Sequence, residues 1–223
     1  MALLHREFGE QLVSCRAEQR AIPRARLLIR PAKLMCAAGE FVAVMRDISV
    51  RGVRLKTFHR LPALDGALLA FPSGDALAVE LVWAKADQIG LRFAAECNID
   101  RVIAGDGAPP PRPLRVDLNL PGRLEIAVGF LRGPAGGPLS VAIRIDNLSG
   151  QGARITSPVA LAQDQPMRLS TPGMAPICAH MRWRQENRYG LAFDETFTLS
   201  EFARLAVRLQ APDLLIGRAL PTG

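Results

Sequence analysis

Aromatic residues are scarce in this sequence, where phenylalanine, tryptophan and tyrosine together make up 5% of the 223 residues. Proteins that bind single-stranded nucleic acid stack bases on aromatic side chains, so this scarcity argues against a nucleic-acid-binding protein. Hydrophobic residues still make up 49% of the chain, which excludes a disordered protein. A core built from so few aromatics must consist mainly of leucine, valine, isoleucine and alanine.

Long apolar runs are also lacking. No segment reaches the roughly 18 apolar residues of a membrane-spanning helix. The first residues, Met1–Leu4 followed by His5, do not form the apolar core of a signal peptide. We therefore expect a soluble, cytoplasmic protein without a membrane span.

Motifs of catalytic and metal sites are missing as well. The sequence has no CxxC pair, no histidine cluster, no recognisable carboxylate pair, no nucleophile with a base and no P-loop. We expect a binding protein that is not an enzyme and has no cofactor or metal. The four cysteines are then expected to be free thiols, buried or partly buried: Cys15, Cys36, Cys97 and Cys178.

Positive charge is present in excess and is unevenly distributed. The formal net charge is +7 and the pI is about 10.0. Residues 16–60 contain eleven lysines or arginines and only three acidic residues. Such a stretch indicates an anionic partner, although a solvated arginine-rich surface is the alternative.

An internal repeat organises the chain. Three blocks recur at an offset of one hundred residues: Asp47–Leu55 with Asn147–Ile155, Trp83 with Trp183, and Gly90–Phe93 with Gly190–Phe193. Three blocks in one register, without a gap, indicate two copies of the same domain.

The repeat and a proline-rich segment set the expected domain boundaries. Residues 104–111 are rich in glycine and proline, which suits an exposed, stiff linker. We expect an N-terminal extension at 1–17, helical by its apolar spacing, a first domain at 18–103, a second domain at 112–212 and a C-terminal tail at 213–223.

Short apolar or alternating segments dominate each copy. In the first copy we expect six strands: Arg26–Arg30, Glu40–Asp47, Gly52–Thr57, Gly66–Phe71, Ala76–Ala84 and Gln88–Phe93. The last two should form a hairpin around Lys85–Asp87. This spacing predicts an all-β fold of two tandem six-stranded antiparallel β-barrels.

A short helix should follow each barrel. In the first copy, Asn98 or Asp100 could cap a helix that runs to Ala104. In the second, Thr198 and Glu201 have the spacing of a capping box. Phe202, Leu205 and Leu209 follow it near one helical face.

Two short motifs in the first copy resemble those of the PilZ domain family. The first is R-x-x-x-R at Arg20 and Arg24, and the second is D-x-S-x-x-G at Asp47, Ser49 and Gly52. The blocks around Trp83 and Gly90 match the family's last strands, so the resemblance covers nearly all of both copies.

The resemblance implies a receptor for the second messenger cyclic-di-GMP. Arg20 and Arg24 would then bond phosphate oxygens or a guanine edge, because the guanidinium is a planar fork. Asp47 would accept hydrogen bonds from guanine, Ser49 would add a donor, and Gly52 would allow close approach. Gln19 stands where an additional arginine favours a dimer of the ligand, so one ligand molecule is favoured.

The second copy departs from this pattern. Asn147, Ser149 and Gly152 keep the second motif, with an amide in place of the carboxylate. Of the first motif only Arg115 remains, and Pro111 stands where the other arginine belongs. We expect these residues to form at most a weak second site.

Two function classes follow. The first is a cyclic-di-GMP receptor that signals through domain packing or through contacts with a protein partner or another copy of itself. The alternative is a degenerate PilZ adaptor that acts through protein–protein contacts without nucleotide. No nucleic-acid partner is expected.

Overall fold

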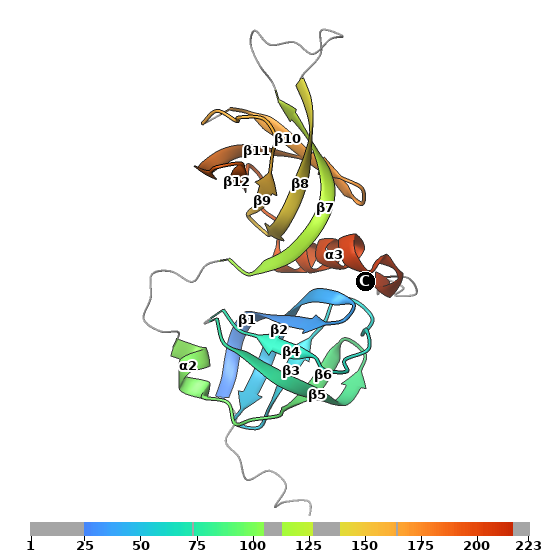
Figure 1. Cartoon of the computed structure of the whole chain (residues 1–223). Helices are drawn as coiled ribbons and strands as arrows, with labels where there is room; N and C mark the ends of the chain where they lie inside the picture. Colours follow the sequence, from blue (N-terminus) through green and yellow to red (C-terminus); the bar gives the residue numbers. More distant parts are fainter. Residues whose placement is uncertain (1–24, 73, 105–112, 127–138, 164, 216–223) are drawn as a thin grey trace, which may run out of the picture.

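The computed structural model describes residues 25–72, 74–104, 113–126, 139–163 and 165–215. The expected N-terminal helix, nearly all of the expected linker and most of the expected tail lie outside these ranges. Within them the chain forms two closed, six-stranded antiparallel barrels, one above the other in Figure 1. The predicted fold class is therefore confirmed.

Each barrel has the same strand order. The strands of the first are β1 (Ala25–Cys36), β2 (Gly39–Ser49), β3 (Gly52–Lys56), β4 (Leu68–Ala70), β5 (Ala76–Lys85) and β6 (Gln88–Phe93). Those of the second are β7 (Arg115–Ile126), β8 (Leu139–Ser149), β9 (Gly152–Thr156), β10 (Met167–Thr171), β11 (Met174–Gln185) and β12 (Arg188–Phe193). Around the first barrel the order is β1-β2-β3-β6-β5-β4, and the second repeats it.

Of the six strands predicted for the first copy, only β6 has the predicted bounds, and β1, β2 and β4 differ in length by three residues or more. β1 continues to Cys36 rather than ending at Arg30, although Pro31 lacks the N–H that a central strand uses. It pairs with β2 along this whole extension, until the turn at Gly39, whose φ is +128°. β4 is shorter than predicted, since only Leu68–Ala70 pair with β1 and β5. The hairpin of β5 and β6 lies where it was expected.

Both predicted helices are present, with their caps. Helix α2 (Ile99–Ala104) follows Asn98, whose side-chain oxygen accepts a hydrogen bond from the Arg101 N–H at 3.0 Å. Helix α3 (Leu199–Gln210) begins with the Thr198–Glu201 capping box and is followed by a 3₁₀ turn, η1 (Pro212–Leu215). Hydrogen bonds from the Thr198 side chain and backbone hold the pKa of Glu201 below its ordinary value.

Helix α3 belongs to the second repeat but contacts both barrels. Figure 1 shows it between them. Phe202 and Ala203 pack into the core of the second barrel, whereas Val207, fully buried, belongs to the core of the first. At its end the Gln210 amide accepts a hydrogen bond from the Glu40 N–H at 2.9 Å and donates one to the Glu40 carbonyl at 2.8 Å. The helix therefore joins the two repeats into one packed unit.

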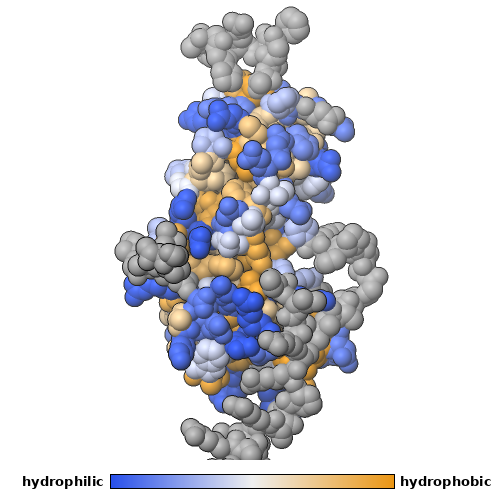
Figure 2. All heavy atoms as spheres, turned by 180° about the vertical axis from the view of Figure 1, so that it is seen from behind, coloured by the Kyte–Doolittle hydropathy of each residue, from blue (hydrophilic) through white to orange (hydrophobic). Residues whose placement is uncertain are grey.

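The surface view from behind agrees with a packed junction. Apolar residues extend over the second barrel and down to the first, between hydrophilic patches (Figure 2). None of the helices in the described ranges has the length and apolar composition needed to cross a membrane.

The cysteines only partly follow the prediction. Cys97 is buried and Cys36 is half-buried. Burial raises the pKa of the Cys97 thiol, and the negative charge of Asp75 adds to the effect. Cys178 is exposed, so the prediction was wrong there. Its neighbour Ala179 points into the barrel, and alternation along β11 turns Cys178 outward. Cys15 lies outside the described residues.

Candidate functional site

The second motif of the first copy spans the turn from β2 to β3. Asp47 lies near the end of β2, opposite Arg54 on β3. Its Oδ2 atom is 2.6 Å from Nη2 of Arg54, and 13% of its side chain is exposed. Ser49 donates a hydrogen bond to the Gly52 carbonyl at 3.2 Å, which closes the turn. The structure thus brings Asp47, Ser49 and Gly52 together.

Gly52 is required by the barrel itself. A Cβ at this position would lie 2.5 Å from the carbonyl oxygen of Leu91 on β6. In the second barrel, a Cβ at Gly152 would likewise collide with the Leu191 carbonyl. The close approach expected at this glycine is therefore an approach to the neighbouring strand, and it occurs in both copies.

The sequence analysis missed one residue beside Asp47, which is Arg54. Strand register places Asp47, Arg54, Gly90 and Trp83 in one row across β2, β3, β6 and β5. The indole of Trp83 lies over Gly90, where a Cβ would collide with it, and 42% of Trp83 is exposed. Trp83 therefore lies at the surface of the barrel, and Arg54 is the unforeseen partner of Asp47. Recurrence of arginine at the offset of one hundred residues was the available signal for Arg54.

The two arginines of the first motif, Arg20 and Arg24, lie outside the described residues. Description of the chain begins at Ala25, which pairs with Ile48 beside Asp47. In the second barrel Val116 pairs with Leu148 in the same way, so Val116 corresponds to Ala25. Arg115, which precedes Val116, therefore corresponds in sequence to Arg24.

The second barrel repeats the arrangement with different chemistry. Arg115 donates a hydrogen bond to Oδ1 of Asn147 at 3.0 Å, and Asn147 donates one to Asp117 at 3.4 Å. Ser149 donates to the Gly152 carbonyl at 3.2 Å, as in the first barrel. The structure therefore brings together all four residues predicted for the second site.

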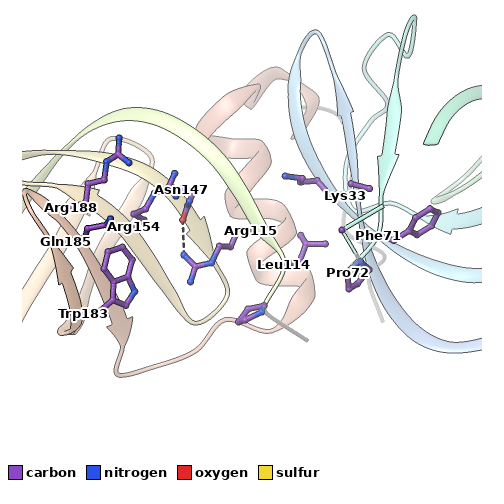
Figure 3. Close-up of a pocket in the computed structure, with 13 residues that line it drawn as sticks. Lys33, Phe71, Pro72, Leu114, Arg115, Asn147, Arg154, Trp183, Gln185 and Arg188 are labelled. Atoms are coloured by element: carbon purple, nitrogen blue, oxygen red, sulfur yellow. Dashed lines mark hydrogen bonds between the residues drawn. The ribbon is translucent and has the colours of Figure 1, made fainter. Parts of the chain in front are cut away.

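A pocket of about 730 Å³ opens beside these residues, between the two barrels; we call it the inter-barrel pocket (Figure 3). Its polar and aromatic lining includes Lys33, Arg115, Asn147, Arg154, Trp183, Gln185 and Arg188. Four of these side chains are cationic, and no acidic residue of the described chain lines the pocket. Figure 3 shows Lys33 reaching towards the second barrel from β1, and Phe71 turned back into the first barrel.

No curated protein matches the sequence. Among solved structures, Borreliella burgdorferi PlzA in complex with c-di-GMP is 15% identical, with 91% of this chain and 99% of that chain covered and a TM-score of 0.35. The K. pneumonia MrkH–c-di-GMP complex is 14% identical, with 92% of each chain covered and a TM-score of 0.31. Escherichia coli YcgR with c-di-GMP is 13% identical, with 74% and 75% covered and a TM-score of 0.28.

A protein-family model gives the clearer result. The model of the PilZ domain matches residues 16–103 and again residues 111–209, which together make up most of the chain. Both matched regions contain one six-stranded barrel and its motif turn. The chain therefore belongs to the PilZ domain family and carries two copies of that domain in tandem.

Proposed function

We propose that this protein is a cyclic-di-GMP receptor and that its first barrel holds the ligand. The observation that carries the proposal is the Asp47 carboxylate. Arg54 fixes its Oδ2 atom, and no described residue donates a hydrogen bond to Oδ1. An ionised carboxylate held in this way can accept hydrogen bonds from the N1 and N2 edge of a guanine.

The other members of the site have distinct roles. Arg20 and Arg24, which precede β1 in the sequence, would bind the phosphates or a guanine edge. Ser49 and Gly52 shape the turn that presents Asp47, through the bond that closes it. Arg54 is a positioning residue, because it acts on the ligand through Asp47.

Ligand binding would reach the second barrel through β2. Asp47 lies near one end of this strand and Glu40, which bonds Gln210 of α3, near the other. We propose that the bound ligand changes the packing of the barrels or their contacts with a protein partner. Small-angle scattering with and without cyclic-di-GMP tests the first alternative, since a packing change alters the radius of gyration.

Calorimetric titration of the full chain with cyclic-di-GMP tests the receptor function. We expect saturable binding to the wild type and loss of the tight event in Arg24→Ala. Each charged hydrogen bond contributes about 1.5–3 kcal/mol, or roughly 10- to 100-fold in affinity. Arg115→Ala is the matched control in the second copy and should leave the tight event unchanged. No saturation of the wild type at tens of micromolar ligand would refute the proposal.

An adaptor function without nucleotide is the second candidate. Strand β5 of the first barrel exposes Leu81, Val82 and Trp83 by 45%, 61% and 42%. Exposed apolar side chains in a row favour contact with another protein. Recovery of one defined partner equally with and without nucleotide, and its loss in Val82→Asp, would favour the adaptor over the receptor.

A further inference from the structure

Much of strand β5 has no strand partner on one of its two edges. β4 pairs only with Ala76–Ala78 of β5, and the Val79 N–H donates to the Ala67 carbonyl at 3.0 Å. From Glu80 to Lys85, β5 pairs with β6 alone among the described residues. An unpaired strand edge is a surface on which a strand of another chain can pair.

The same part of β5 exposes apolar side chains. All six residues from Glu80 to Lys85 are exposed, and Val82 is the most exposed of the large hydrophobic ones, at 61%. Leu68 on the neighbouring strand β4 is exposed as well. Four of the five large hydrophobic residues exposed in the described part of the chain thus lie on β4 and β5. Such a cluster favours contact with another protein surface.

The corresponding strand of the second barrel carries charge instead. β10 pairs with β11 only as far as Ala179, so β11 has the same unpaired edge. The register with the neighbouring strand shifts at the same place in both copies, at Val82 in β5 and at Arg182 in β11. Two residues further on, Ala84 corresponds to Arg184. Charged side chains keep strand edges from pairing with other chains, and the first barrel lacks this protection.

The exposed segment of β5 is complementary to itself. If two copies are placed antiparallel about a two-fold axis at the middle of the segment, Glu80 of each faces Lys85 of the other, and Leu81–Ala84 face one another. Opposite charges that face each other across antiparallel strands stabilise the pair. In β11 the same positions hold His180 and Gln185, which do not form such an ion pair.

The two charges of the segment lie on one face of the sheet. Glu80 pairs with Arg92 and Lys85 with Gln88, and these two residues of β6 are four apart, so they share a face. In a regular strand, residues five apart such as Glu80 and Lys85 would point to opposite faces. The register shift at Val82 therefore turns both charges towards the same side of a partner strand.

Lys85 is available for such a contact. It has no acidic partner among the described residues. Glu80 pairs with Arg92 at 2.6 Å, with both side chains more than half exposed, and its carboxylate can accept a second cation on the solvent side.

We propose that two copies of this chain associate through β5, with the two strands antiparallel about a two-fold axis. The apolar residues of each strand would cover those of the other, and Glu80 of each would pair with Lys85 of the second copy. A patch that is complementary to itself gives a closed dimer rather than a filament. The contact is small, so we expect a weak dimer whose population depends on protein concentration. It would form without nucleotide and is independent of the proposed receptor function.

Sedimentation equilibrium of the full chain without nucleotide tests the association, from about 1 µM to 1 mM protein. We expect the average mass to rise with concentration towards that of two chains. Val82→Arg gives β5 the residue that β11 has at the same place, and it should weaken the association at least about tenfold, since like charges then meet at the axis. Arg182→Ala is the matched control and should leave the association unchanged.

Charge reversal tests the register of the two strands. Glu80→Lys and Lys85→Glu should each weaken the association, because like charges then face each other across the axis. The double variant should recover most of it, since the ion pairs form again with exchanged signs. Arg92 cannot account for the recovery, because its own partner Glu80 is lost in the double variant. Thermal melting should show that all variants fold.

Three results would overturn the proposal: the mass of one chain at every concentration, equal weakening by Arg182→Ala, or a double variant no better than the single ones. A monomeric wild type that captures a different protein through Val82 would assign β5 to that partner instead. Calorimetry with cyclic-di-GMP tests the receptor function separately, so failure of one proposal is distinguishable from failure of the other.

Discussion

The two barrels share their architecture and differ in the chemistry of one turn. Ser49 and Ser149 make the same hydrogen bond across that turn, at 3.2 Å in each case. However, the residue paired across the strands with the arginine of each turn is Asp47 in the first barrel and Asn147 in the second. The serine and the glycine are the same in both turns, so the barrel fold requires them. The charge of the residue beside the arginine differs, and that charge is what a ligand can distinguish.

The helices differ more than the barrels do. Helix α2 spans six residues, whereas α3 spans twelve and covers part of both cores. The first barrel therefore depends on a helix from the other repeat. The following predictions test how far the two copies are equivalent.

The largest effect is expected from Val207→Asp. Val207 is fully buried in the first core although it belongs to the second repeat, and a buried unpaired charge should lower the free energy of unfolding by about 3 kcal/mol or more. This loss of stability is measured by urea unfolding in a Trp183→Phe background, where the fluorescence of Trp83 reports on the first barrel. The exposed neighbour in Arg208→Gln is the control. An unchanged Trp83 transition would mean that α3 does not complete the first barrel.

Gly52→Ala and Gly152→Ala should destabilise the protein by similar amounts. A Cβ at either position meets a backbone carbonyl of the neighbouring strand, and such overpacking costs about 1–3 kcal/mol. Urea unfolding of the two variants gives the comparison directly. A cost at one glycine only would show that the two turns are not equivalent.

Asp47→Asn makes the first turn resemble the second. It removes the ion pair with Arg54 and should cost about 1–2 kcal/mol, because the guanidinium loses its contact with a buried carboxylate. The reverse change, Asn147→Asp, offers a carboxylate to Arg154 and should cost less than Asp47→Asn. Chemical denaturation measures both, and equal costs would contradict the difference in charge between the turns.

The smallest effect concerns pH and the cap of α3. Because the pKa of Glu201 is lowered in the folded protein, its contribution to stability is present above its ordinary value of 4.5. That contribution is lost as the pH falls through the lower, folded value. The difference in melting temperature between wild type and Glu201→Gln should therefore be small at pH 7 and vanish at low pH. A difference that grows on acidification would contradict the capping role.

The sequence alone predicted the repeated parts well. The blocks around Asp47 and Gly90 located the motif turn and the last strand of each barrel, and Thr198 located the start of α3. These features depend on residues that are neighbours in the chain or across one turn, so local sequence patterns predict them. The binding of ligand by Arg20 and Arg24 remains a prediction.

Other features of the structure could not be predicted from local sequence patterns. Nothing in the spacing of α3 tells which barrel Val207 enters, because its partners lie more than one hundred residues away. The pairing of Asp47 with Arg54 depends on the irregular register between β2 and β3. The inter-barrel pocket needs both domains in place, since Lys33 and Arg188 line it from different repeats.

The position of Val207 has a consequence for synthesis of the protein. The strands of the first barrel are complete at Phe93, yet Val207 and the Gln210–Glu40 bonds arrive more than one hundred residues later. At about 5–20 residues per second, a ribosome needs roughly 6–23 s to supply them. During that interval one end of the first barrel exposes apolar surface. The nascent chain is then most vulnerable to aggregation or chaperone capture, and a premature stop after the first repeat would leave it in that state.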